Sequence, residues 1–124
     1  MEPRRAFTGT PWEPKIGYCR AVRAGSHIFV SGCAPVGCEG KGPYEQARRC
    51  AEILEKALKE LGAELRHVVR TRMFVTDISK WPEFGRAHGE SFAANPPATT
   101  MVEVRALIDP WMLIEIEADA IVGD

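Results

Sequence analysis

The stretch "PYEQARRCAEILEKALKELG", residues 43–62, decides the fold class because it predicts one long amphipathic helix. Its apolar residues recur at intervals of three and four, as they do on one face of an α-helix. They are Ala47, Cys50, Ala51, Leu54, Ala57, Leu58 and Leu61. Pro43 suits the first turn of a helix, and Gly62 suits its end. The apolar face needs a second layer to cover it, and the flanking segments predict that this layer is a sheet.

The segment before this helix predicts a β-hairpin followed by a loop. In "YCRAVRAGSHIFVSG" we expect strands at residues 19–23 and 27–31, with Ala24 and Gly25 in the turn between them. The next stretch, "CAPVGCEGKG", is rich in glycine and has no periodicity. It therefore predicts a loop that leads into the helix.

The segment after the helix predicts a strand, a second helix and two more strands. In "HVVRTRMFVTD" the side chains alternate between two faces. The residues expected on one face are Val69, Thr71, Met73 and Val75, and those on the other are Arg70, Arg72 and Phe74. Asp77 or Ser79 can cap the second helix, which should end before the "NPP" at residues 95–97. Its expected buried stripe is Trp81, Phe84, His88 and Phe92, and the last strands are expected at about residues 99–104 and 112–121.

The element order β-β-α-β-α-β-β predicts an α+β fold, with residues 1–124 forming a single domain. Two helices should cover one face of a mixed sheet and leave the other face open. That open face is either solvated or buried by another subunit. The residues suited to a polar, partly buried interface there are Arg70, Arg72, Glu103, Glu115 and Glu117.

Composition narrows the classes of function. The 124 residues hold 16 Lys and Arg against 17 Asp and Glu without large clusters of like charge, so a nucleic-acid partner is not favoured. No apolar run approaches the ~20 residues that a membrane span needs, and the N-terminus lacks the apolar segment of a secretory signal. We therefore expect a cytoplasmic protein. The four cysteines form no C-x-x-C pair, so no metal site is predicted.

Five motifs, in their order and spacing, resemble those of the Rid family, the YjgF-type proteins that are also called L-PSP endoribonuclease-like. The motifs are "GY" at residues 17–18, "IFVSG" at 28–32, "FVTD" at 74–77, "PPATTMVEV" at 96–104 and "IEIEA" at 114–118. The resemblance implies a chorismate-mutase-like two-layer fold assembled as a homotrimer, with ligand clefts between adjacent subunits. It also implies hydrolysis of reactive 2-imino or enamine acids to 2-oxo acids and ammonia, without a metal or an organic cofactor.

The resemblance also implies roles for particular residues. Glu115 matches the family's catalytic glutamate, which positions or activates water and must therefore lie within hydrogen-bond reach of it. The residues matched to the lining of the cleft are Tyr18, Ser31, Gly32 and Met101. Cys33 directly follows "SG" and is a further candidate for the cleft, with simple packing as the alternative.

Thr99 is the main departure from the family pattern. In the deaminases an arginine at this position holds the substrate carboxylate with its planar fork. A threonine hydroxyl offers one neutral hydrogen bond, worth ~1 kcal/mol, against ~1.5–3 kcal/mol for a charged contact. Strand alternation places Arg20 on the same face as Tyr18, which makes Arg20 the first candidate to replace the missing positive charge, and Arg72 the second.

The expected function is therefore the binding of a small carboxylate, carbonyl or imine metabolite between subunits. Two alternatives stay open, hydrolysis of an enamine or imine and non-catalytic binding. RNA cleavage, which the family's older name suggests, is not favoured because the sequence shows no aromatic-plus-basic patch and no paired histidines. Glu115 on an alternating strand is equally well explained as an ion-pair residue, so its surroundings decide between these roles.

Overall fold

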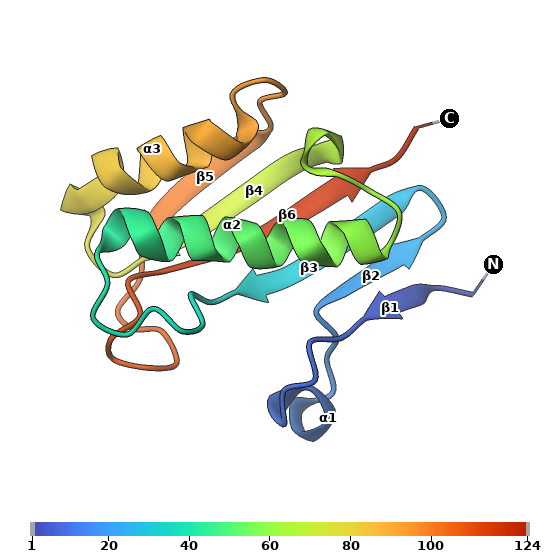
Figure 1. The fold of residues 1–124 in the computed structure, drawn as a ribbon, viewed down its shortest axis with the longest axis horizontal. Helices are drawn as coiled ribbons and strands as arrows, with labels where there is room; N and C mark the ends of the chain where they lie inside the picture. The colour runs from blue at the N-terminus through green and yellow to red at the C-terminus, as the bar shows by residue number, and fades with distance from the viewer. Residues whose placement is uncertain (1, 124) are drawn as a thin grey trace.

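Six strands form one sheet with two long helices across one of its faces in the computed structural model, which describes residues 2–123 (Figure 1). The strands are β1 (Arg4–Ala6), β2 (Ala21–Ala24), β3 (His27–Cys33), β4 (Val68–Val75), β5 (Ala98–Glu103) and β6 (Ile114–Ile121). The helices are α1 (Trp12–Ile16), α2 (Pro43–Glu60) and α3 (Trp81–Phe92), with short 3-10 turns at Leu65–His67 and Ile78–Lys80. The spatial strand order is β1-β2-β3-β6-β4-β5, and only β4 and β5 run parallel. The predicted mixed sheet is confirmed.

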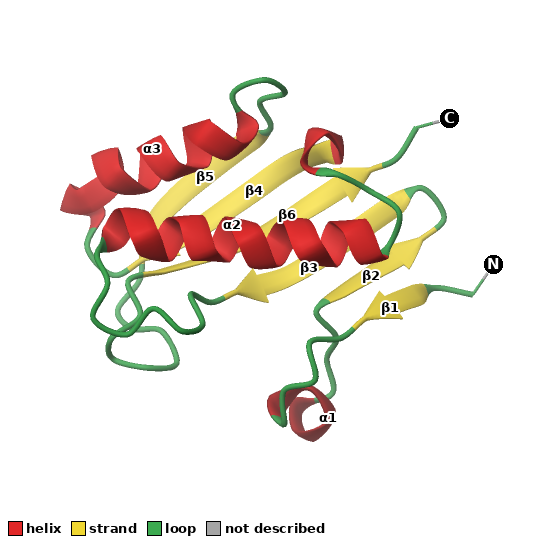
Figure 2. Cartoon of the chain, in the orientation of Figure 1, coloured by secondary structure: helices red, strands yellow, loops and turns green. Residues whose placement is uncertain are grey.

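The hydrophobic core lies between the sheet and the pair α2 and α3 (Figure 2). The predicted apolar face of α2 is confirmed, because its buried apolar residues are Ala47, Cys50, Ala51, Leu54, Ala57 and Leu58. Alternate residues of β6 meet this face from the sheet, namely Ile114, Ile116, Ala118 and Ala120. Full burial of one leucine or isoleucine side chain stabilises a fold by ~1.5–3 kcal/mol. This burial fixes which face of β6 turns to the helices, and so which residues are left on the open face.

Gln46 is a fully buried polar residue of α2 that the sequence pattern did not single out. Its side-chain amide donates to the carbonyls of Lys41 and Trp111, each at 3.1 Å. Its side-chain oxygen accepts from the Leu113 backbone N–H at 2.8 Å. A buried amide is stable only with its hydrogen bonds made. Gln46 therefore fastens the loop before α2 to the segment that leads into β6.

Two elements near the N-terminus were not predicted. β1 pairs with β2 over only three residues, with Ala6 opposite Ala21. α1 has five residues and contains Pro14. Segments this short show no periodicity in the sequence. A strand as short as β1 forms only because it pairs with another strand, here β2. The sheet therefore has six strands where the sequence predicted five.

Two side-chain predictions were wrong. Val69 is 44% exposed, while Val68 is buried, because the pairing of β4 with β6 shifts register between Val68 and Arg70. A bulge of this kind turns one residue out of the alternation. Trp81 is 60% exposed, because it is the first residue of α3 and its ring lies beside Gly85 on the same helix.

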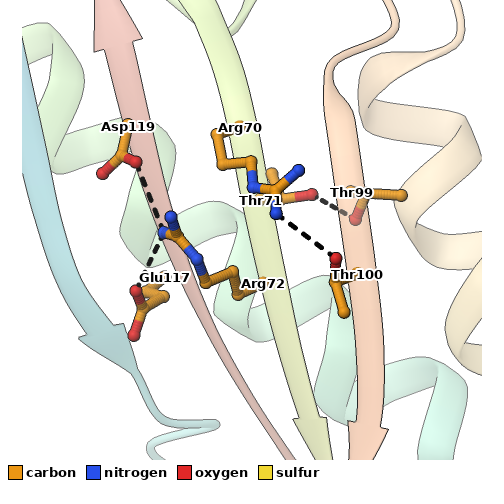
Figure 3. Close-up of polar contacts among 7 residues, drawn as sticks. All are labelled: Arg70, Thr71, Arg72, Thr99, Thr100, Glu117 and Asp119. Carbon is orange, nitrogen blue, oxygen red and sulfur yellow. Dashed lines mark hydrogen bonds and ion pairs between the residues drawn. The ribbon is translucent and has the colours of Figure 1, made fainter.

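The open face of the sheet carries a row of paired charges (Figure 3). Arg72 lies between two acidic residues of β6, at 3.1 Å from Glu117 and 3.3 Å from Asp119. Arg70 donates to the Thr100 hydroxyl at 3.5 Å. Exposed apolar residues lie on the strands of the same face, namely Phe29, Val102 and Ile121. Within residues 2–123, no helix combines the length and the apolar character that a membrane crossing requires.

Candidate functional site

Glu115 lies on the open face of β6, between two residues that point into the core. Ile114 and Ile116 are buried, and alternation along the strand turns Glu115 to the opposite side. Its side chain lies directly over Gly32 in β3, so that a Cβ at position 32 would come within 2.8 Å of Glu115 Cδ and overlap the carboxylate. Gly32 falls where the pairing of β3 with β6 shifts between Val30 and Cys33. The bulge in β3 and the absence of a Cβ at Gly32 together leave the space that the Glu115 carboxylate occupies.

The carboxylate of Glu115 is half-buried and unpaired. Burial raises its pKa above the usual value, the charge of Glu117 raises it further, and the charge of Arg20 opposes the rise. Among residues 2–123 it makes no hydrogen bond and no ion pair. A carboxylate that is partly desolvated and has free lone pairs is a stronger base than an exposed one. Glu115 can therefore bind and polarise a water molecule.

Arg20 lies behind Gly32 as a buried cation, with 8% of its surface exposed. Its Nη1 donates to the carbonyls of Gly32 and Ser31, and its guanidinium lies 5.6 Å from the centre of the Tyr18 ring. Tyr18 and Arg20 precede β2, which begins at Ala21, so their contact does not arise from the predicted strand alternation. The guanidinium lowers the pKa of Glu115, although burial has the larger, opposite effect. Arg20 thus supplies positive potential beside the carboxylate while its Nη1 is held by backbone oxygens.

Ser31 and Cys33 flank Gly32 and have structural partners of their own. The Ser31 hydroxyl donates to the Cys19 carbonyl at 2.7 Å, which joins β3 to the segment before β2. Cys33 is fully buried, and burial raises the pKa of its thiol to about 11, against the opposing charge of Arg20. A neutral thiol is a poor nucleophile. The geometry therefore favours packing, the alternative role of Cys33, over covalent chemistry.

Thr99 lies in a different environment, on the edge strand β5. Its hydroxyl accepts a hydrogen bond from the Thr71 hydroxyl at 2.6 Å (Figure 3). Thr71 Oγ1 also lies 2.8 Å from His88 Nε2 on α3. Thr71 is fully buried toward the helices, so the Thr99 hydroxyl lies on the helix side of the sheet. Burial lowers the pKa of His88, which favours its neutral form. Met101, two residues further on, packs against the core.

One chain therefore brings together only part of the predicted site. The residues that lie together around the β3 bulge are Tyr18, Arg20, Ser31, Gly32, Cys33 and Glu115. Thr99 and Met101 lie on the opposite side of the sheet, separated from β6 by β4. Arg72 is held by Glu117 and Asp119 and does not approach Glu115 closely enough for an ion pair. The Thr71–His88 contact was not predicted, because it joins a strand residue to a residue on α3.

The described residues do not offer a set of metal ligands. Within residues 2–123, no three His, Cys, Asp or Glu side chains lie close enough together to hold an ion. The chemistry available at the β3 bulge is that of a carboxylate, a buried guanidinium and backbone groups. These groups can bind a polar ligand and transfer a proton.

The family is decided by a match over most of the sequence. The model of the family described as Endoribonuclease L-PSP matches residues 9–122. This chain belongs to the Rid (YjgF) family. The Rid fold is also found in a solved member of the YjgF/YER057c/UK114 family from Mycobacterium tuberculosis, with a TM-score of 0.93 and 44% sequence identity over 98% of this chain and 100% of that one. The expected chorismate-mutase-like two-layer fold is confirmed.

Curated relatives of this Rid chain match it over nearly their full length. An uncharacterized protein of Streptomyces coelicolor is 35% identical, over 97% of this chain and 92% of the relative. A RutC family protein of Pyrococcus abyssi is 34% identical, over 92% of this chain and 93% of the relative. The match therefore extends over nearly the full length of this chain and of these two relatives.

Proposed function

We propose that this Rid-family protein binds a small carbonyl- or imine-type metabolite beside Glu115 and hydrolyses the imine or enamine to a carbonyl compound and ammonia. The observation that carries the proposal is the unpaired, half-buried carboxylate of Glu115 over Gly32. A carboxylate kept only for stability would be expected in an ion pair, as Glu117 is with Arg72. The free lone pairs of Glu115 suit a water molecule.

In the proposed reaction Glu115 acts as base and then as acid. Its carboxylate accepts a proton from water as the water oxygen adds to the imine carbon. The carboxylic acid then returns this proton to nitrogen, which gives a carbinolamine. The carboxylate next carries the proton of the new hydroxyl to nitrogen, the C–N bond breaks, the C=O bond forms and ammonia leaves. One imine and one water give one carbonyl compound and one ammonia. The raised pKa of Glu115 suits both steps, because it strengthens the base and keeps the acid form accessible.

The substrate class follows from Thr99. Without the family's arginine, a substrate carboxylate at this position meets a hydroxyl that is already bonded to Thr71. One neutral hydrogen bond, at ~1 kcal/mol, holds a carboxylate poorly. We therefore propose that the preferred imine is not a 2-imino acid but one that lacks a carboxylate next to the reacting carbon.

The site is completed by a second copy of the chain in this proposal. Glu115 and Thr99 lie on opposite sides of one sheet, so a cleft that contains both needs the edge strand β5 of a neighbour. The open face carries exposed Phe29, Val102 and Ile121 together with paired charges, a mixture typical of partly polar interfaces. A homotrimer is the expected assembly. Light scattering that gives a monomer mass at micromolar concentration would contradict it.

The experiment compares two imines that differ in their carboxylate. An amino acid oxidase generates a 2-imino acid, an amine oxidase generates an imine without a carboxylate, and semicarbazide traps whatever is not hydrolysed. Native protein should hydrolyse the second imine faster, and Thr99→Arg should shift the preference to the first. Glu115→Gln should lose both activities. If native protein hydrolyses neither imine but binds a carbonyl compound, the non-catalytic alternative is correct.

A further inference from the structure

A cavity of about 340 Å³ lies on the helix side of the sheet, away from the Glu115 carboxylate. It is enclosed by α2, by the segment before α1 and by the loop after β3. The lining residues that matter here are Thr10, Arg20, Val36, Ile53, Lys56 and Ala57. Its size is at the lower end of the range for small-molecule sites. Because Ile53 and Ala57 belong to α2, the cavity is separate from the open face on which Glu115 lies.

Two buried polar atoms without a partner belong to residues that line this cavity. Thr10 Oγ1 and Arg20 Nε are the buried side-chain nitrogen and oxygen atoms that make no hydrogen bond within residues 2–123. Arg20 is more than nine-tenths buried, and its Nη1 is already bonded to backbone carbonyls. Buried polar atoms are rarely left unpaired in folded proteins. The presence of both residues in the lining of one cavity points to a ligand.

The charges around the cavity favour a ligand with one negative charge. Arg49 is paired with Glu52 at 3.3 Å, so these two charges offset each other. Lys56 and Glu60 also line the cavity and make no ion pair within residues 2–123. Arg20 is bonded only to neutral groups, so its positive charge is not neutralised by direct contact. Among the residues that line the cavity, Arg20, Lys56 and Glu60 together leave one positive charge, and the carboxylates of Glu13 and Glu115, on which the charge of Arg20 also acts, lie outside this lining.

We infer that this cavity binds a small monocarboxylate with a short apolar body. We assign its carboxylate to the Arg20 Nε–H and the Thr10 hydroxyl, which belong to two residues that line the cavity. Its apolar body packs on Val36, Ile53 and Ala57. Neither donor atom is open to solvent, so the ligand reaches them through small rotations of the two side chains. Glu115 does not line the cavity, so the inference does not require the proposed hydrolysis, although Arg20 both lines the cavity and lowers the pKa of Glu115 through its charge.

The test uses sodium butyrate as the probe and the methyl group of Ile53 as the reporter. In protein labelled at isoleucine methyl groups, butyrate should shift the Ile53 resonance in a saturable way. The neutral analogue butanol, and sodium chloride at equal ionic strength, should shift it far less. An Ile53→Val variant assigns the resonance. An equal response to butanol, or no saturable response to butyrate, would overturn the inference.

Matched variants separate the carboxylate contacts from the fold. Thr10→Val keeps the shape of the side chain and removes a hydroxyl that has no partner, so the variant should fold with an unchanged or higher Tm. It should weaken butyrate binding at Ile53 about tenfold, and Lys56→Gln should weaken it about threefold. Lys59→Gln on the same helix should have no effect, since Lys59 pairs with Glu55 outside the cavity. Native affinity in Thr10→Val would contradict the inference.

Glu115→Gln distinguishes this site from the proposed hydrolytic site. The variant should lose imine hydrolysis and keep butyrate binding at Ile53, because the cavity does not contain Glu115. Loss of butyrate binding in Glu115→Gln would show that the two sites are one, which would overturn this inference and leave the proposed function standing.

Discussion

Glu115 and Glu117 project from the same face of β6, two residues apart, and differ in what surrounds them. Glu117 lies 3.1 Å from Arg72, in a charge row that also includes Asp119. Glu115 lies over Gly32, and no cation within residues 2–123 comes close enough to it for an ion pair. The comparison separates a carboxylate held in a structural contact from one that is free to bind water or a ligand.

A second contrast lies across the sheet. Around Glu115 the chain assembles charged groups and a backbone bulge, whereas around Thr99 it assembles a chain of neutral groups that runs through Thr71 to His88. Neutral hydrogen bonds give local order without strong attraction for a charged ligand. The edge strand is therefore suited to position a neighbour or a neutral substrate group rather than to hold an anion.

The largest expected effect comes from removing the charge of the free carboxylate. Glu115→Gln keeps the size of the side chain and removes its basicity, so imine hydrolysis should fall by about 10²–10⁴-fold, the range for general acid–base groups. Glu117→Gln is the matched control and should change the rate by less than about threefold. Ammonia release under single-substrate conditions measures both. Equal losses in the two variants would break the distinction between them.

Gly32→Ala tests whether the bulge positions the carboxylate. The new Cβ would overlap the Glu115 side chain, so we expect about 1–3 kcal/mol lower stability together with reduced hydrolysis. Gly89→Ala on α3 is the control, because a Cβ there meets no atom within 4 Å and should stabilise the helix by about 0.5–1 kcal/mol. Urea unfolding measures both free energies. A neutral Gly32→Ala would show that the carboxylate is mobile.

Thr71→Val tests the neutral hydrogen bonds that link Thr99, Thr71 and His88. The substitution removes a buried hydroxyl and leaves His88 Nε2 and the Thr99 hydroxyl without this partner. We expect a loss of about 1–3 kcal/mol in the free energy of unfolding, the cost of an unsatisfied buried group. Thr99→Val should cost less, because Thr99 is exposed and water can replace its contact with Thr71. The reverse order of the two losses would show that Thr99, not Thr71, organises this region.

The smallest expected effect is a change in stability of opposite sign when each of the two glutamates is replaced, with a pH dependence expected for Glu115. The folded protein raises the pKa of Glu115, so this residue favours folding below its unfolded pKa and loses that contribution as pH rises through its folded pKa. Glu115→Gln should therefore raise the free energy of unfolding at pH 7, and the gain should vanish at acidic pH, below the ordinary carboxyl range. Glu117→Gln should lower stability slightly at pH 7, by about 0.2–1 kcal/mol, because it breaks an ion pair. Urea unfolding across this pH range gives the sign for each variant, and a gain in both would contradict the assignment of Glu117 to a structural pair.

The sequence predicted burial correctly where the pattern of apolar residues repeats within a single helix or strand. The apolar face of α2 and the alternation of β6 were readable because burial repeats at 3.6 or 2 residues within a single segment. Val69 and Trp81 were misplaced for reasons that lie outside such patterns. A bulge set by pairing with β6 turned Val69 outward, and the position of Trp81 at the end of α3 left its ring exposed.

The sequence proposed residues for the candidate site but did not show how they are arranged. The family motifs pointed to Glu115, Gly32 and Thr99, and the fold then put Thr99 on the other side of the sheet from Glu115. Register decides the side, because Thr99 lies opposite Thr71, whose side chain is buried toward the helices. Strand order adds a lateral separation, because β4 lies between β5 and β6 although the motifs of β5 and β6 are neighbours in sequence. Sequence separation does not report spatial order in a mixed sheet.

The sequence by itself determined the two-layer fold, the polar character of the open face and the absence of an arginine at position 99. These depend on residue type and local period. Only the tertiary structure decided which carboxylate is free, which arginine is buried and where a cavity opens behind it. Charge pairing and burial depend on contacts between residues that lie far apart in the chain, such as Arg72 with Glu117 and Arg20 with Gly32. Such contacts form only when strand order and register are set, and no local pattern records them.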